Sequence, residues 1–374
     1  MDRLEVLIQR CYAGLDADQL RSEVLARLRG VLTVDAAFFA TVDPATVLFT
    51  SAMVDEPLGA VTEQFIANEF GQDDVNKFAV LAGGRDPVRS LGQATKGDWG
   101  SSPRYAEVMR PLGLGDELRA ALLSNGRCWG VLCLHREKAQ AGFADHEVQL
   151  VRRLAPHLGE ALRLGLRPTA SETQEFDPGL TDHTVWYAGG PRVGPGVVML
   201  DTRLRLQSSS AEADHWLSEL GASRTPGGRP HLQAHNPQAD NLRAGELPVA
   251  VRAVAARMQL DQATARVKVR TRTGDWLQLQ ASRLGEDGQI VVVIEPVTAG
   301  QLGSLLLDLH GLTPAQQRVT GLLLRGYSTR QIVERLCLSP HTVQEHVRAS
   351  FDKVGVGSQR ELVSVLLRGS ASRG

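Results

Sequence analysis

The feature that most constrains this chain is a series of four helix-start signals near its carboxyl terminus. Three of them are capping boxes, in which a Ser or Thr is followed three residues later by Gln or Glu, and the fourth is a Ser-Pro pair. Gly326 and Gly355 fall where helices would stop, because glycine enters the left-handed conformation without steric cost. The signals predict helices at about 313–325, 328–336, 340–354 and 358–368.

Each of these four helices carries one apolar stripe, so the four would pack around a small common core. Only Cys337-Leu338-Ser339 separates the second from the third, which is the tight connection of a helix-turn-helix. Residues 312–374 hold nine Lys or Arg and four Asp or Glu, a formal charge of +5, although the whole chain carries −1. A basic helix-turn-helix predicts binding to double-stranded DNA, with the third helix in the major groove.

The segment GLTPAQQRVTGLLLRGYSTRQIVERLCLSPHTVQEHVRASFDKVGVGSQRELV resembles the LuxR-type helix-turn-helix. The most specific parts are the LT opening, GYS before the second helix, SPHTVQEHV in the third, and KVGV after it. The chain departs from the family at Gln316, Gln331 and Gln359, where the family commonly has charged residues, but glutamine preserves capping or hydrogen bonding. The resemblance implies a transcription regulator that binds a DNA operator and that works with RNA polymerase as a further partner.

Helical periodicity nominates the residues of the third helix that face DNA. With the apolar residues of this helix turned inward, Gln344, Glu345 and Arg348 lie on its outward face and are the candidates for reading bases. A second group has the charge or the position to contact phosphates instead: Thr342, Arg330 and Lys353.

Residues 1–165 are expected to form a mixed domain of helices and strands. The pair Asn125-Gly126 predicts a hairpin near 117–135, and apolar residues at helical spacing predict a long closing helix over 144–164. By the order of its elements and by the fragment LRAALLSNGRCWGVLCLHR, this region resembles a GAF-like sensor domain.

Residues 166–194 have the composition of a linker. Residues 195–297, with a strand, turn and strand, then a helix, a long loop and returning strands, predict an antiparallel sheet of about five strands and resemble a PAS-like sensor domain. Residues 298–311 form a coupling helix or linker, and 312–374 the DNA-binding domain. The expected fold is an α+β multidomain protein with a GAF-like α/β sensor, a PAS-like α+β sensor and an all-α four-helix LuxR-type unit, an arrangement known from actinobacterial regulators.

The sensor domains are expected to bind a small-molecule effector, to mediate dimerisation, or both. Ligand cavities are mostly apolar, so aromatic and apolar side chains of the first domain are candidates for lining one, although most of them are expected to serve only an ordinary core. These candidates are Phe38, Phe39, Phe65, Phe78, Trp99, Tyr105, Met109 and Trp129. The helices 144–164 and 358–368 are candidate faces of a homodimer.

The remaining motifs favour a protein that is not an enzyme and that needs no cofactor. Cys133 and His135 share one face of a strand, but no third ligand is nearby in sequence, so no metal site is predicted. The chain has no phosphate-binding loop of the G-x-x-x-x-G-K-[ST] type. Two alternatives stay open, a GAF-domain enzyme and an RNA-binding antiterminator.

Four scattered cysteines and the lack of a long apolar run predict a cytoplasmic protein with no membrane segment, associated with the nucleoid when it is bound to DNA. The apolar face of the coupling segment (Leu302, Leu305, Leu306 and Leu309) must be buried somewhere. Burial that depends on a bound effector would reposition the DNA-binding unit.

Overall fold

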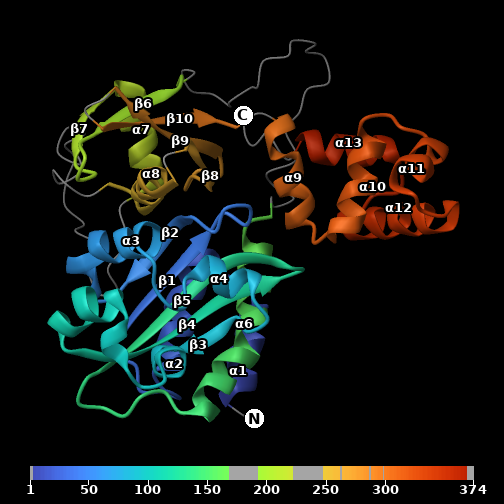
Figure 1. Ribbon diagram of the computed structural model, residues 1–374. Helices are drawn as coiled ribbons and strands as arrows, with labels where there is room; N and C mark the ends of the chain where they lie inside the picture. Colours follow the sequence, from blue (N-terminus) through green and yellow to red (C-terminus); the bar gives the residue numbers. More distant parts are fainter. Residues whose placement is uncertain are drawn as a thin grey trace, which may run out of the picture. The chain divides into compact units, whose positions relative to one another are not determined.

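The computed structural model describes residues 3–167, 193–221, 247–261, 263–285, 288–297 and 299–368 (Figure 1). The chain divides into two compact units. The first comprises Met1–Gly165 and Val193–Pro296, and the second comprises Leu166–Arg192 and Val297–Gly374. Most of the expected linker 166–194 and of the expected long loop after residue 221 lies outside the described residues.

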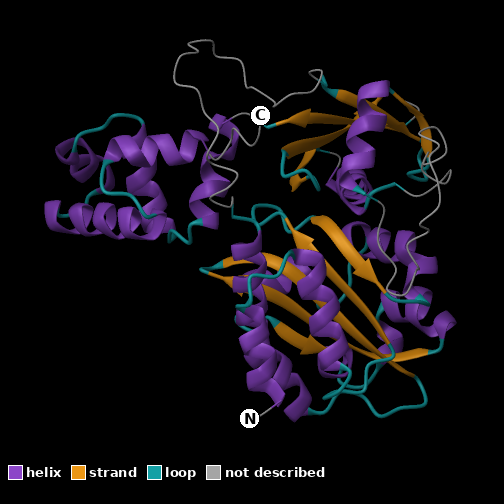
Figure 2. Ribbon diagram, turned by 180° about the vertical axis from the view of Figure 1, so that it is seen from behind, coloured by secondary structure: helices purple, strands orange, loops and turns teal. Residues whose placement is uncertain are grey.

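An antiparallel sheet in the order β2-β1-β5-β4-β3 forms the centre of the amino-terminal domain (Figure 2). Asn125 and Gly126 have φ angles of 50° and 74°, the left-handed values that a two-residue hairpin turn requires, so the predicted hairpin is confirmed. The strands are β1 (Ala36–Val42), β2 (Phe49–Val54), β3 (Val88–Ser90), β4 (Leu114–Ser124) and β5 (Arg127–Glu137).

Helices cover both faces of this sheet. On one face, α6 (Asp145–Gly165) packs along β4 and β5 together with α1 (Arg3–Cys11) and α2 (Ala17–Leu28), which confirms the predicted long helix. Gly159 of α6 lies so close to the backbone of β4 that an added Cβ would be 2.7 Å from a carbonyl oxygen. The other face is covered by α3 (Thr62–Gly71), α4 (Phe78–Gly83), α5 (Leu91–Thr95) and the short helical turns Leu58–Val61, Trp99–Ser101, Tyr105–Met109 and Arg110–Leu112.

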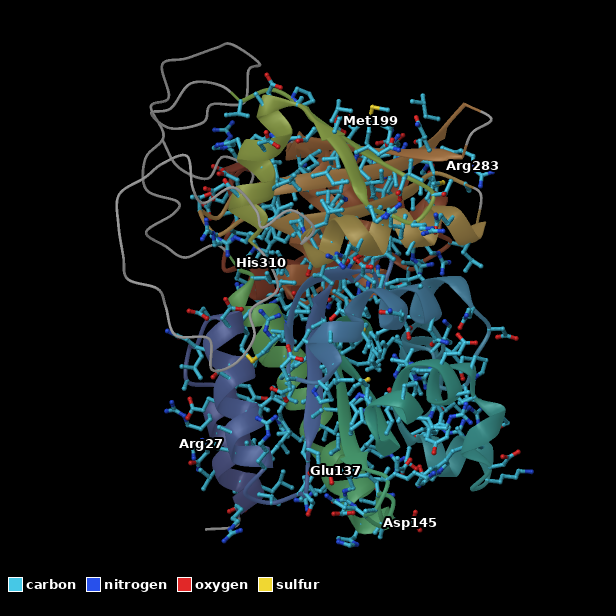
Figure 3. The ribbon with its side chains drawn as sticks, turned by 90° about the vertical axis from the view of Figure 1, so that its left-hand side faces the viewer. Arg27, Glu137, Asp145, Met199, Arg283 and His310 are labelled. Carbon is cyan, nitrogen blue, oxygen red and sulfur yellow. The ribbon has the colours of Figure 1, made fainter. Side chains whose placement is uncertain are left out.

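A second antiparallel sheet has the order β7-β6-β10-β9-β8, five strands as predicted. On β6, Val198 and Leu200 point into the core, whereas Val197 and Met199 lie on the outer face (Figure 3). The strands are β6 (Gly196–Leu200), β7 (Leu206–Ser209), β8 (Ala265–Arg270), β9 (Trp276–Leu284) and β10 (Gln289–Pro296).

Two helices accompany the second sheet. The predicted helix is α7 (Ala211–Leu220), whose amino terminus is capped by Ser210. The sequence analysis did not predict α8 (Val249–Asp261). This helix is buried on almost every side, so its apolar residues form no stripe by which periodicity would reveal a helix. Within the same unit, α8 packs against α3, where Arg252 Nη1 lies 2.8 Å from Glu63 Oε1.

The second unit consists of helices where it is described, and its four predicted helices are confirmed as α10 (Pro314–Leu324), α11 (Thr329–Leu336), α12 (Pro340–Val354) and α13 (Gln359–Arg368). The coupling segment is also helical, as α9 (Ala299–Leu309), and packs against α13. The apolar face predicted for it is buried: Leu302, Leu305, Leu306 and Leu309. Among the described residues, no helix is both long and apolar enough to cross a membrane.

Candidate functional site

The turn between α11 and α12 sets the direction of the outward-facing helix. Cys337 ends α11 in the left-handed region at φ 51°, and Ser339 then caps α12, its Oγ accepting a hydrogen bond from the Thr342 amide at 3.1 Å. At the other end, Gly355 adopts φ 80° and its amide donates to the Phe351 carbonyl at 2.8 Å. Both ends of α12 are therefore defined by local hydrogen bonds.

A buried polar chain holds α12 against α10. Thr320 Oγ1 donates to Ser350 Oγ at 3.0 Å, and Ser350 Oγ donates to the His346 carbonyl at 2.7 Å. Thr320 and Ser350 are fully buried, as is Val343, which inserts from the same face of α12. Because buried hydroxyl groups are costly without partners, these bonds fix how α12 lies on α10.

The predicted base-reading residues share the opposite face of α12. Gln344, Glu345 and Arg348 are all exposed. Glu345 Oε1 lies 3.3 Å from His341 Nε2 on the same face, and both side chains remain mostly exposed. The helix thus presents an amide, a carboxylate and a guanidinium to solvent.

The three predicted phosphate contacts lie in different environments. Arg330 is exposed and lies 3.1 Å from Glu334, and Thr342 is half-buried, with Oγ1 2.9 Å from Ser339 Oγ. Lys353 instead ties helices together, because its Nζ donates to the Gly311 carbonyl at 2.8 Å and to Gln316 Oε1 at 3.0 Å. Periodicity alone did not reveal this internal role.

The end of α9 is bound to the helix-turn-helix by polar contacts as well as by its apolar face. Gln317 Nε2 donates to Asp308 Oδ1 at 2.6 Å and to the Leu312 carbonyl at 2.9 Å. With the Lys353 contact to Gly311, these bonds make α9 an extension of the four-helix module.

The structure separates the candidate effector residues into groups. Phe38 packs on Phe65 with ring centroids 4.8 Å apart, and Phe49, which the sequence analysis did not nominate, links Phe38 at 5.0 Å to Phe78 at 6.1 Å. Trp99 and Tyr105 form a separate pair 5.6 Å apart, and Tyr105 and Met109 lie on one short helical turn. Phe39 and Trp129 are fully buried outside this aromatic cluster.

Next to the aromatic cluster lies a buried charged network that the sequence analysis missed. Arg104 is fully buried and donates from Nε to Glu117 Oε2 at 2.9 Å, with Nη2 2.8 Å from the same oxygen. Arg119 is also fully buried, bonds Glu69 Oε2 at 2.6 Å, and lies 3.8 Å from the centroid of the Phe78 ring. Two guanidinium groups and their carboxylates therefore occupy the core of the first domain.

Glu117 also faces a cysteine and a histidine of β5. Its Oε1 lies 3.3 Å from Cys133 Sγ and 3.9 Å from His135 Nε2, and all three side chains are fully buried. Burial acts to raise the pKa of Glu117, but Arg104 and Arg119 outweigh it and lower the pKa to about 2. Burial lowers the pKa of His135 to about 4, so the imidazole is neutral at pH 7.

These three side chains are the group among the described residues whose atoms could together hold a metal ion, since their ligand atoms lie within 4.8 Å of one another. No metal site was predicted here, because Cys133 and His135 have no third ligand nearby in sequence. Glu117 comes from the neighbouring strand, directly opposite His135. Only the pairing register of the hairpin could have revealed it.

Two parts of the chain match the models of known protein families. Residues 16–162 match the GAF domain, and residues 310–366 match the bacterial regulatory proteins of the luxR family. The chain therefore contains an amino-terminal GAF domain and a carboxy-terminal LuxR-family helix-turn-helix domain, as the sequence analysis predicted. The PAS-like character of the middle region stays a prediction. No curated protein matches the chain significantly.

Several solved structures are similar to parts of the chain at low identity. The phage VqmA-DPO complex is 17% identical, covering 48% of this chain and 83% of that chain, with a TM-score of 0.26. The Vibrio cholera VqmA-ligand-DNA complex is 19% identical, covering 33% and 66%, with a TM-score of 0.18. The E. coli DhaR(N)-DhaL complex is 14% identical, covering 79% and 88%, with a TM-score of 0.23.

Proposed function

We propose that this protein, with its GAF domain and its LuxR-family helix-turn-helix, is a sequence-specific transcription regulator that reads duplex DNA with α12 and responds to a small-molecule effector. The observation that carries the DNA-reading role is the exposed face of α12 formed by Gln344, Glu345 and Arg348. This face belongs to a helix held on its other side by Val343 and Ser350, so its side chains would enter a groove on a rigid support.

The chemistry of the exposed face suits direct reading of base edges. Arginine pairs with guanine O6 and N7, glutamine with adenine, and glutamate accepts from cytosine N4, each pair contributing about 1–3 kcal/mol of discrimination. Arg330 is the best-placed phosphate contact, since its guanidinium is exposed. The amino terminus of α12 at Pro340 is the positive end of the helix dipole and adds its own attraction for a phosphate.

Coupling between sensor and DNA is proposed to run through α9. This helix buries Leu305 and Leu309 and is bonded to α10 through Asp308 and Gln317, so displacing α9 would displace the DNA-binding module with it. The domains would act as a homodimer on paired half-sites, with α13 and α6 as candidate faces. Since α13 already contacts α9, an effector that shifts α9 would also alter the surface that α13 offers to a second copy.

The state of the two buried cysteines of the GAF domain supports a non-enzymatic role. Burial raises the pKa of Cys128 to about 12 and the pKa of Cys133 well above its usual value. Because the thiolate is the nucleophilic form, neither cysteine is prepared for nucleophilic catalysis at neutral pH.

The test is operator binding by the full-length protein after mapping of its bound genomic DNA. We expect Arg348→Ala to weaken specific binding by about 1–3 kcal/mol while leaving binding to unrelated DNA nearly unchanged. Arg330→Ala serves as the control and should weaken both in equal measure. Unchanged discrimination in Arg348→Ala would remove this residue from the readout, and failure of the wild type to prefer any sequence would overturn the proposed function.

The coupling of effector binding to DNA binding through α9 is tested separately. The ligand for this test is a metabolite that shifts the melting temperature of the full-length protein in a screen. In the wild type this ligand should change operator affinity. The variant Leu305→Gln/Leu309→Gln should still bind operator but lose the response to the ligand. A response that persists in the variant would contradict the role of α9.

A further inference from the structure

We propose that Glu117, Cys133 and His135 form a binding site for one divalent transition-metal ion, Zn²⁺ or Fe²⁺, inside the GAF domain. Neither the GAF domain nor the LuxR-family domain implies this site. It does not rest on the proposed DNA-reading role, because metal binding is measured on the protein without DNA.

The hairpin register brings the three residues together. Glu117 of β4 pairs directly with His135 of β5, and Cys133 lies two residues before His135 on the same face of the strand. All three side chains are fully buried, and their ligand atoms lie within 4.8 Å of one another. Residues from two paired strands of a rigid sheet make a more exact site than residues on loops.

The distances between ligand atoms suit a single ion. Metal–ligand bonds of about 2.0–2.3 Å in tetrahedral geometry place neighbouring ligand atoms roughly 3.3–3.7 Å apart. Glu117 Oε1 lies 3.3 Å from Cys133 Sγ and 3.9 Å from His135 Nε2. The separation of Cys133 Sγ from the imidazole is within 4.8 Å, so the ring would have to move toward Sγ as well as toward Oε1 to complete three corners of the tetrahedron.

The unpartnered imidazole of His135 is the second observation that points to a ligand. Among the described residues, neither its Nδ1 nor its Nε2 has a hydrogen-bond partner, although the ring is fully buried. Buried polar atoms are almost always hydrogen-bonded. The nitrogens of this ring therefore need a partner that does not come from the described protein atoms. A metal ion bound to Nε2 would be such a partner.

Arg104 orients the carboxylate of Glu117. Its Nε and Nη2 both lie within 2.9 Å of Glu117 Oε2, so Oε1 is the oxygen that faces Cys133 and His135, with Arg119 Nε also 3.7 Å from it. A group that binds the far oxygen of a ligating carboxylate acts as the outer-shell support that metal sites commonly have.

The charges of the network can accommodate a dication. Its two buried guanidinium groups and the half-buried ammonium of Lys77, which donates to backbone carbonyls, face three acidic side chains, so the network is neutral before any ion binds. The thiolate of Cys133 and a dication together add +1. The acidic side chains are Glu69, Asp74 and Glu117.

Binding is a ligand exchange without oxidation or reduction. The Cys133 Sγ–H bond breaks, a bond from Sγ to the metal forms, and the proton leaves to solvent. The mixed sulfur, nitrogen and oxygen donor set suits Zn²⁺ and Fe²⁺ better than Mg²⁺ or Ca²⁺, which take oxygen ligands.

The test uses the full-length protein produced in medium supplemented with Co²⁺, so that the ion is present while the buried site folds. Cobalt serves as a coloured probe of a zinc or iron site, because thiolate ligation gives an intense charge-transfer absorption. We expect the wild type to hold ~1 Co²⁺ per chain with this absorption. Parallel cultures with Zn²⁺, or with Fe²⁺ without oxygen, and elemental analysis then identify the preferred ion.

Two variants remove ligands, and one is a matched control. Cys133→Ser should lose the thiolate absorption, and His135→Gln should bind the metal at least tenfold more weakly. Cys128→Ser alters a second buried cysteine of β5, whose Sγ donates to the Gly130 carbonyl at 3.2 Å, and should bind as the wild type does.

The wild-type measurement keeps the proposal falsifiable even if a variant does not fold. A folded wild type without bound metal and without thiolate absorption overturns the site. The same conclusion follows if Cys133→Ser keeps the absorption or if Cys128→Ser loses it. Operator binding by a metal-free wild type would leave the DNA-reading role intact, so the two proposals fail separately.

Discussion

Replacing Lys353 with methionine distinguishes two roles that a lysine near the end of α12 can have. A lysine that neutralises a DNA phosphate contributes to affinity and to its salt dependence, whereas a lysine that ties helices together contributes to stability. The Nζ of Lys353 lies 2.8 Å from the Gly311 carbonyl and 3.0 Å from Gln316 Oε1. We therefore expect Lys353→Met to destabilise the helix-turn-helix and to leave the salt dependence of DNA binding unchanged.

The magnitude follows from the two hydrogen bonds. Hydrogen bonds that involve a charged group contribute about 1.5–3 kcal/mol, and methionine keeps most of the apolar stem of the lysine. In a domain of this size, each kcal/mol shifts the melting temperature by about 4–8 °C, so the expected fall is on the order of 10 °C. Gly311 is buried, and its carbonyl would lose this partner.

Arg330→Met is the matched control. The Arg330 side chain is 90% exposed and its ion pair with Glu334 is exposed as well, so its removal should change stability by less than about 0.5 kcal/mol. Each phosphate contact contributes about 0.9 to the slope of log affinity against log salt concentration. We expect Arg330→Met to lower the slope by about this amount.

Both quantities are measured on the full-length protein. Fluorescence anisotropy with labelled operator DNA at several salt concentrations gives the slope, and hydrogen exchange of peptides from α10 and α12 gives the local stability. A Lys353→Met variant with unchanged hydrogen exchange in α10 and α12 and a slope reduced by about 0.9 would refute the internal role and restore Lys353 as a phosphate contact.

Three further predictions concern the amino-terminal domain. Gly159→Ala should destabilise it by about 1–3 kcal/mol in urea unfolding, because the added Cβ meets the backbone of β4, and a neutral result would show that α6 can move away. Arg119→Met should cost about 3–5 kcal/mol because it leaves the carboxylate of Glu69 buried without its ion-pair partner, with the Phe78 amide still bonded to it, whereas a loss below 1 kcal/mol would contradict this pairing. Burial acts to raise the pKa of Asp74, but Arg104 and hydrogen bonds lower it on balance. As pH falls, Asp74 therefore takes up its proton in the unfolded chain before it does so in the folded one. The stability that the ionised carboxylate gives the folded state is lost as pH falls below about 4. Asp74→Asn should accordingly flatten the acid limb of the stability curve, and parallel curves for variant and wild type would argue against this role.

Local sequence rules predicted most elements because the interactions that define them are local. The side chains of Thr313 and Ser328 bond to amides three residues away, and Asn125-Gly126 forms a turn within itself. The helix α8 was missed for the opposite reason. Its apolar residues are buried on nearly all sides, so its pattern depends on what surrounds it in space.

The candidate sites also divide into residues placed by local sequence rules and residues placed by tertiary contacts. Periodicity correctly predicted that Gln344, Glu345 and Arg348 share an exposed face, since a helix repeats every 3.6 residues whatever it packs against. The aromatic candidates of the first domain lie on two sides of the sheet, and Phe49 was not predicted. Contacts between strands and distant helices join residues far apart in the sequence, so no short segment predicts them.

A register shift in the β4–β5 hairpin is the feature that the sequence did not predict. The turn alone determines that Ser124 pairs with Arg127, and continuing this register would place Glu117 opposite Leu134. The pairing shifts by one residue between Leu122 and Leu123, so Glu117 lies opposite His135 instead. By itself, then, the sequence determined the hairpin, the helix caps and the exposed face of α12, all of which depend on neighbours along the chain. Only the tertiary structure decided that a carboxylate, a thiol and an imidazole share one buried face, because a one-residue shift in strand pairing exchanges the two faces of a sheet.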